Sequence, residues 1–222
     1  GLKPEDGLLP MFRRTMPDNT ETDDLNRDLL RDAAEQVQKQ ADGLPVYYTE
    51  WNGCATFGAP GNDTRKVAAY DVRAALSAED FIDGSSIWCF SDIFEEIHPF
   101  PEEFHGGYGL VTQHGIAKPL FHALRLLGQA GDKRLELPGA LDGEVSVAAF
   151  RDAADTQLTV LATKQNLHHY AGQSTPATPV EIEVELDAKP QSVQLCRIDE
   201  EHGNPLKCWQ AMGEPEDMTP AQ

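Results

Sequence analysis

The order of helical and strand-like segments before residue 131 is the feature that most constrains the fold. Three segments carry apolar residues at helical spacing, and two short apolar runs lie between them. In chain order, these segments are a helix over 24–40, a strand over 44–50, a helix from Asn62 or Asp63 to about residue 80, a strand over 84–92 and a helix from Pro119 to about Gly128. Helices that alternate with apolar strands predict a parallel α/β sheet.

The pattern changes after Gly131, where strands follow one another without helices between them. The predicted strands cover 144–150, 157–164, 180–186 and 191–198. The third of these alternates strictly between apolar residues and Glu, which indicates an antiparallel sheet with one face in water. The simplest arrangement of such strands is a β-sandwich. We therefore predict a domain over residues 1–131 and a second domain over residues 132–222.

The first predicted domain is too small to be complete. It holds only two strand–helix units, whereas a closed parallel barrel has about eight. A two-stranded parallel sheet would expose both edges and most of its apolar faces, which makes a poor independent unit. This part of the sequence thus predicts the tail of a larger α/β domain.

The charge balance restricts the partners of the chain. Lys and Arg number 18 against 37 Asp and Glu, so the net charge is −19, which disfavours nucleic acid and anionic lipid and is compatible with neutral sugars. The apolar runs are shorter than the roughly 20 residues of a membrane helix, and the first residues lack the apolar core of a signal peptide. We expect a soluble chain and, by default, a cytoplasmic location. Its four cysteines are expected to be free thiols, with Cys196 and Cys208 the pair to test.

A lone glutamate, Glu50, ends the first apolar strand. Trp51 and Asn52 follow it directly. In α/β barrels the reacting groups lie at the carboxyl ends of the strands, where Trp can stack on a sugar ring and Asn can bind a hydroxyl group. The residue pattern allows two readings of Glu50, a catalytic carboxylate or a solvated strand end.

The end of the second apolar strand is rich in aromatic and acidic residues. Trp88 and Phe90 alternate with Cys89, so strand periodicity places the two aromatic rings on one face. The carboxylates that follow can each accept two or more hydrogen bonds from sugar hydroxyl groups; these residues are Asp92, Glu95 and Glu96. The alternative is an acidic turn with no role in binding.

The sequence offers no pattern typical of a metal or nucleotide site. Glu95 to His98 and Glu102 to His105 both read Glu-x-x-His, but Pro and Gly residues interrupt the segment, so the pairs cannot share a helix face. Neither a phosphate-binding loop nor a G-x-S-x-G elbow is found. We therefore expect no metal and no cofactor.

Four motifs occur together in one order: YYTEWN, DGSSIWCFSDIFEE, FHGGYGLVTQHGIAKP and RIDEEHGNPLKCWQAMGEP. In this order and approximate spacing the chain resembles glycoside hydrolase family 39, the β-xylosidase family, from about residue 40 to the C-terminus. The resemblance implies a retaining β-glycosidase with a (β/α)8 barrel followed by a β-sandwich. The expected substrate is a xylo-oligosaccharide or another β-xyloside, with no cofactor.

The resemblance also implies roles for individual residues. The Thr-Glu motif of the family nucleophile falls on Thr49 and Glu50, at the end of the seventh barrel strand. The sugar-contacting motif of the eighth strand falls on Trp88, Phe90, Asp92, Glu95 and Glu96. Phe104 and His105 match a loop that borders the same pocket, and Asn52 lies next to the nucleophile motif.

One departure from the family pattern bears on activity. The acid/base of the family is the Glu of an Asn-Glu-Pro motif at an earlier strand end, and this motif occurs nowhere in the chain. We therefore expect a C-terminal portion of a β-xylosidase-like enzyme, with the nucleophile but without its partner, inactive alone. A homo-oligomer is a further expectation. The competing hypothesis is a non-catalytic carbohydrate-binding or interaction protein derived from the same fold.

Overall fold

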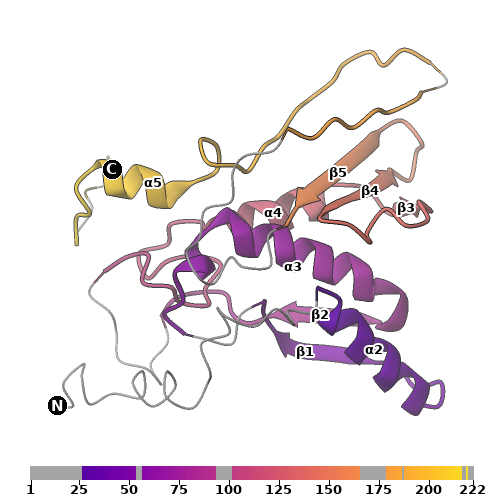
Figure 1. Cartoon of the computed structure of the whole chain (residues 1–222), viewed down its shortest axis with the longest axis horizontal. Coiled ribbons are helices and arrows are strands. Elements are labelled where there is room, and N and C mark those ends of the chain that lie inside the picture. Colours follow the sequence, from indigo (N-terminus) through magenta and orange to yellow (C-terminus); the bar gives the residue numbers. More distant parts are fainter. Residues whose placement is uncertain are drawn as a thin grey trace.

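The computed structural model describes residues 27–53, 57–93, 102–165, 179–186, 188–216 and 219. Figure 1 shows α3 between two small sheets, with β1 and β2 on one side and β3, β4 and β5 on the other. The elements of this α/β chain are α2 (Leu29–Gln40), β1 (Tyr47–Trp51), η3 (Pro60–Asp63), α3 (Arg65–Ala78), η4 (Glu79–Phe81), β2 (Gly84–Ile87), α4 (Pro119–Gly128), β3 (Lys133–Leu135), β4 (Val145–Arg151), β5 (Leu158–Lys164) and α5 (Pro205–Ala211).

The two predicted apolar strands form a parallel pair, which confirms the α/β pattern of this part of the chain. Tyr47 of β1 lies opposite Gly84 of β2, and Trp51 lies opposite Ile87 after an irregularity in the register. Strand β2 ends at Ile87, earlier than the predicted residue 92. The reason is that residues 89–92 hydrogen-bond with 108–111 instead of continuing along β1. The Trp88–Cys89 peptide bond between the two regions is cis.

Two helix starts differ from the sequence prediction. The N-cap of α3 is Thr64, whose Oγ1 accepts a hydrogen bond from the Lys66 N–H at 3.3 Å, and not Asn62 or Asp63. Those two side chains hydrogen-bond instead with the backbone of Gly106, so they are not available to the helix end. Helix α2 begins at Leu29, after the predicted residue 24. Helix α4 has the predicted bounds, with Pro in its first turn.

The second half of the chain contains an antiparallel sheet of order β3-β4-β5. Strands β4 and β5 pair from Val145–Lys164 to Arg151–Leu158, which confirms two predicted strands. The predicted strands over 180–186 and 191–198 are wrong, since these residues are extended without ladder pairing. The short strand β3 and the helix α5 were not predicted, although Asn204 and Pro205 are typical of a helix start.

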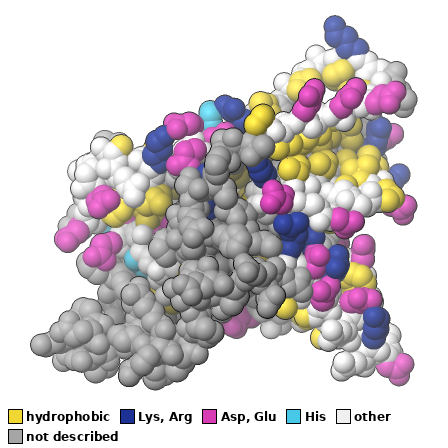
Figure 2. All heavy atoms as spheres, in the orientation of Figure 1, with side chains coloured by type: hydrophobic (Ala, Val, Ile, Leu, Met, Phe, Trp, Pro, Cys, Tyr) yellow, Lys and Arg dark blue, Asp and Glu magenta, His cyan; other side chains and the backbone are white. Residues whose placement is uncertain are grey.

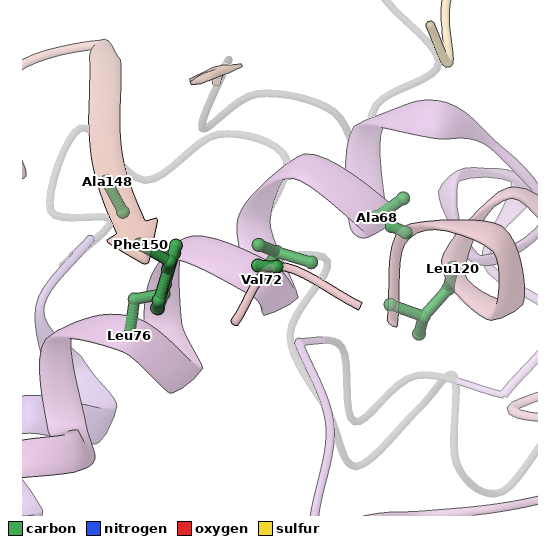
Figure 3. Packing of buried hydrophobic residues seen from close by; sticks show 8 residues of the cluster. Ala68, Val72, Leu76, Leu120, Ala148 and Phe150 are labelled. Carbon is green, nitrogen blue, oxygen red and sulfur yellow. The ribbon is translucent and has the colours of Figure 1, made fainter. Parts of the chain in front are cut away.

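The main hydrophobic core joins α3 and α4 to β4. Figure 3 shows Phe150 of β4 against Leu76 of α3, with Val72 and Ala68 continuing the row toward Leu120 of α4. Polar contacts join the same parts, because the Arg73 guanidinium donates to the Leu141 carbonyl oxygen at 2.8 and 3.1 Å. Packed side chains thus connect the parts on both sides of residue 132, and the predicted domain boundary stays a prediction.

Several apolar side chains of the second half are exposed. Figure 2 shows hydrophobic side chains at the upper right, where Figure 1 places β4, β5 and the extended segments. Val193 and Leu195 are 83% and 79% exposed, and the apolar residues of 180–186 are 39–44% exposed. Within the described ranges, no helix combines the length and the apolar character needed to cross a membrane. Cys89, Cys196 and Cys208 are free thiols, and Cys54 lies outside the described residues.

Candidate active site

The carboxyl ends of β1 and β2 bring together two of the segments that the sequence analysis selected. The Trp88 N–H donates to the Trp51 carbonyl oxygen at 2.8 Å. The Asn52 side chain completes the connection, because its Nδ2 donates to the Trp88 carbonyl oxygen at 3.3 Å. The residues at the carboxyl ends of the two strands therefore lie side by side.

Glu50 is the penultimate residue of β1, and its side chain is exposed. Parallel strands of α/β proteins present their functional groups at this end of the sheet. An exposed carboxylate here is open to a ligand that approaches from the strand ends. The role of Glu50 as the nucleophile stays a prediction.

The two predicted aromatic binding residues lie beyond the end of β2. Trp88 is 36% exposed and Phe90 is 69% exposed, so both rings offer apolar surface to a ligand. Their backbone is fixed, since the Phe90 carbonyl oxygen accepts the Val111 N–H at 3.1 Å. Exposed Trp faces are typical of sites that bind the apolar face of a sugar ring.

Asp92 occupies a different environment from the one expected of a sugar contact. Its side chain is fully buried and pairs with Lys118 Nζ at 2.6 Å, while Lys118 also pairs with Asp63 at 2.6 Å. We call these three residues the Lys118 cluster. Burial raises the pKa of Asp63, and the Lys118 charge opposes this effect. The buried Asp92 carboxylate therefore does not offer the exposed acceptor that the sequence analysis expected.

The Lys118 cluster holds the loops that follow β1 and β2 together at Gly106. Asp63 Oδ2 accepts the Gly106 N–H at 2.6 Å, and Asn62 Nδ2 donates to the Gly106 carbonyl oxygen at 2.9 Å. Gly106 has a φ of +79°, and a Cβ there would lie 2.6 Å from the Gly58 carbonyl carbon. Only glycine fits this close approach of two backbones.

Phe104 and His105, which the resemblance predicted at the border of the pocket, lie in this second loop. The Phe104 ring packs on Trp209 of α5 with ring centroids 5.5 Å apart. His105 Nδ1 donates to the Glu102 carbonyl oxygen at 3.1 Å, and its ring lies 5.7 Å from that of Phe57. Their contact with substrate stays a prediction. Glu95 and Glu96 lie outside the described residues.

A small cavity borders the strand ends, and sequence reasoning missed its acidic residue. Asn52, Ile87 and Trp88 line it together with Asp71 of α3. Asp71 is fully buried, and burial raises its pKa to about 8, with the Gly53 backbone amide lowering it in part. An Asp in an Ala-rich helix resembles a surface position, so the sequence alone gave no signal for this residue.

The sequence analysis also did not predict the contact between the side chains of Glu103 and His114. Glu103 is fully buried, and its carboxylate accepts a hydrogen bond from His114 Nδ1. Trp209 of α5 was missed as well, because its packing on Phe104 joins residues far apart in sequence. Within the part of the chain that the structure describes, no three His, Cys, Asp or Glu side chains gather in a way that could hold a metal ion.

The parallel β1–β2 pair and its helices make this an α/β chain, with an exposed carboxylate and an exposed Trp near the carboxyl ends of the strands. A sequence model of glycosyl hydrolases family 39 matches residues 16–222. The chain therefore belongs to glycosyl hydrolases family 39, which confirms the resemblance found in the four motifs.

Individual relatives agree with this assignment. The chain is 32% identical over 194 residues to a beta-xylosidase of Caldicellulosiruptor saccharolyticus, covering 82% of this chain and 37% of the relative. It is 33% identical over 172 residues to a beta-xylosidase of Geobacillus stearothermophilus, covering 78% of this chain and 32% of the relative. The chain thus spans about a third of the length of these curated relatives.

Solved structures show the same fold. The crystal structure of a monomeric beta-xylosidase from Caulobacter crescentus CB15 matches with a TM-score of 0.67 and 25% identity, over 89% of this chain and 42% of that chain. The family 39 enzyme from Xanthomonas axonopodis pv. citri matches with a TM-score of 0.61 and 22% identity, over 86% of this chain and 40% of that chain. The second match supports the fold alone.

Proposed function

We propose that this chain is part of a retaining β-glycosidase, with a terminal β-xyloside as the substrate. The observation that carries the proposal is the exposed Glu50 at the carboxyl end of β1, next to the Asn52–Trp88 contact. Family membership supports glycoside hydrolysis, and both named curated relatives are beta-xylosidases. The parallel β1–β2 pair with its helices is assigned to the last two strand–helix units of a (β/α)8 barrel, followed by an accessory β-sandwich.

Glu50 is proposed as the nucleophile. Its carboxylate oxygen forms a bond to the anomeric carbon as the bond to the leaving oxygen breaks, and water later hydrolyses this ester with a second inversion. A retaining enzyme needs another carboxyl group about 5–5.5 Å away to protonate the leaving oxygen and then to deprotonate water. We propose that this acid/base is not among these residues, because the chain contains no Asn-Glu-Pro sequence.

The other residues of the site are proposed to bind the sugar. Trp88 stacks on the ring, and Asn52, whose Nδ2 is engaged with Trp88, presents its Oδ1 to a hydroxyl group. Glu95, Glu96, Phe104 and His105 complete this proposed binding set. The acidic chain, with a net charge of −19, suits a neutral saccharide better than nucleic acid or an anionic membrane. A cytoplasmic location and a homo-oligomer also remain proposals.

The experiment that tests Glu50 uses a mechanism-based label. A dinitrophenyl 2-deoxy-2-fluoro-β-xyloside carries a leaving group that departs without acid assistance, so the missing acid/base does not prevent the first step. We expect a covalent adduct on Glu50 in peptide mass spectra. An unactivated aryl xyloside should not be turned over by the chain alone.

Two variants control the labelling experiment. Glu50→Gln should abolish the adduct, whereas Glu79→Gln, at a surface glutamate paired with Arg134, should leave it unchanged. An adduct at another residue would overturn the nucleophile assignment. A folded chain that binds xylosides but forms no adduct would favour the non-catalytic carbohydrate-binding protein.

A further inference from the structure

The Asp71 carboxyl group lies directly against the backbone that follows the candidate nucleophile. A Cβ added at Gly53 would clash with Asp71 Oδ1 and would lie 2.8 Å from the Tyr70 ring. Residue 53 must therefore be glycine while Asp71 keeps its place on α3. Gly53, three residues after Glu50, therefore packs against this carboxyl group.

Asp71 also shares a cavity with the two residues that link the strand ends. Asn52 and Trp88 line this cavity beside Asp71, and the Asn52 amide donates to the Trp88 carbonyl oxygen. The Gly53 backbone amide is the hydrogen-bonding group that acts on the Asp71 carboxyl group, and the described residues offer its two oxygens no other partner. A fully buried carboxyl group with so little compensation is costly, so its position against Gly53 requires an explanation.

We propose that Asp71 is a positioning residue of the candidate active site, which fixes Gly53 and, through it, Asn52 and the end of the Glu50 strand. This inference rests on the proposed role of Glu50. Asp71 does not contact the reacting atoms. It acts through the backbone of the segment that carries the binding amide.

The protonation state of Asp71 makes this role dependent on pH. Burial raises the pKa of Asp71 to about 8, so the group is a neutral acid at neutral pH and ionises in mild alkali. An ionised Asp71 is a buried charge opposed chiefly by the Gly53 amide, and the segment should move to hydrate it. The loss of the proton should therefore disturb Asn52.

The cationic groups near Asp71 are already paired with other carboxylates, so they do not compensate the charge of an ionised Asp71. Tyr70 and Arg73 flank it on α3, and Arg73 is already paired with Asp28. Burial raises the pKa of Tyr70, and the Asp71 charge adds to this effect. The Lys118 cluster reaches the same cavity through Gly107 and Gly109, but its ammonium group is held by its own two carboxylates.

The test follows the positioned groups directly by nuclear magnetic resonance. In the unmodified chain, the Gly53 backbone amide and the Asn52 side-chain amide should shift together, with a midpoint at a pH of about 8. Asp71→Asn, which mimics the neutral acid, should abolish this titration and keep the neutral-pH signals. Asp83→Asn is the matched control, since Asp83 accepts the Val46 N–H at the other end of β1, and should leave the titration intact.

Labelling of Glu50 provides the functional readout. Above the midpoint, the labelling rate of the unmodified chain should decrease with pH and approach a tenfold decrease per pH unit. The labelling rate of Asp71→Asn should not change over this range. Amides that do not titrate, or that still titrate in Asp71→Asn, would overturn the positioning role. Absence of label at every pH would refute the proposed function of Glu50, while the amide titration would still decide the role of Asp71.

Discussion

At the residue scale, one lysine forms ion pairs with both loops of the candidate site, the loop after β1 and the loop after β2. Lys118 is 1% exposed and pairs with Asp63 and Asp92, whose acidic groups are also buried. A buried ion pair contributes little relative to an apolar replacement of the whole group, but removal of one partner leaves charge without compensation. The stability of the loops should therefore depend on this single ammonium group.

Replacement of Lys118 by Met should lower the free energy of unfolding by about 3–5 kcal/mol, because two buried carboxylates lose their counter-ion. Chemical denaturation at neutral pH measures the change. Lys39→Met is the matched control, since Lys39 pairs with Glu35 at the surface and should change stability by less than about 1 kcal/mol. Equal effects of the two substitutions would show that the Lys118 cluster is not a stabilising centre.

The sequence predicted that Glu50, Asn52 and Trp88 lie near strand ends, and the structure places them there, because strand ends are visible in the local pattern. The role of Asp92 was not visible, since it depends on Lys118, which lies 26 positions later in the chain. Acidic residues at a strand end suit both sugar recognition and a buried ion pair. Only the fold distinguishes the two, because it decides which carboxylate is covered.

At the scale of elements, the start of α3 shows how a tertiary contact changes a local rule. Asn, Asp and Thr are all good N-cap residues, and Asn62, Asp63 and Thr64 stand in succession. The first two are engaged with Gly106, so the cap falls to Thr64. The third residue of the run is therefore the N-cap, and the helix begins at Arg65.

Thr64→Ala should destabilise the chain by about 1 kcal/mol, because the first turn of α3 loses its side-chain acceptor. Thermal unfolding followed by circular dichroism measures this effect. Thr64→Ser keeps the hydroxyl oxygen and should retain most of the stability. If Ala and Ser at this position behave alike, the cap is made by another residue.

Residues 180–186 show the limit of pattern for strands. Alternation of Val, Ile and Leu with Glu predicts a strand with one wet face, but a strand forms only when a second backbone pairs with it. The structure gives this segment no ladder, and its apolar side chains stay 39–44% exposed. Strands β4 and β5 do form as predicted, because they are joined by a short turn and each pairs with the other.

At the scale of the whole molecule, the change of pattern near residue 132 does not coincide with a change of core. Phe150 lies on β4, beyond the predicted boundary, yet it is 5% exposed and belongs to one cluster with Leu76 and Leu120. Arg134 adds a polar connection, since its Nη1 donates to the Leu76 carbonyl oxygen at 2.8 Å. A sheet and two helices that share buried side chains should lose their structure together.

We therefore expect one cooperative unfolding transition, with coincident curves from tryptophan fluorescence and far-ultraviolet circular dichroism. Phe150→Ala should shift both curves equally and cost about 3–5 kcal/mol, because it leaves a cavity between α3 and β4. Phe90→Ala, at a 69% exposed ring, should change stability by less than about 0.5 kcal/mol. Two separate transitions, with Phe150→Ala affecting only one, would instead establish the boundary near residue 132 as a limit of independent folding. The shared core predicts the single transition because most of the buried residues that form one cluster with Phe150 lie on the other side of that boundary.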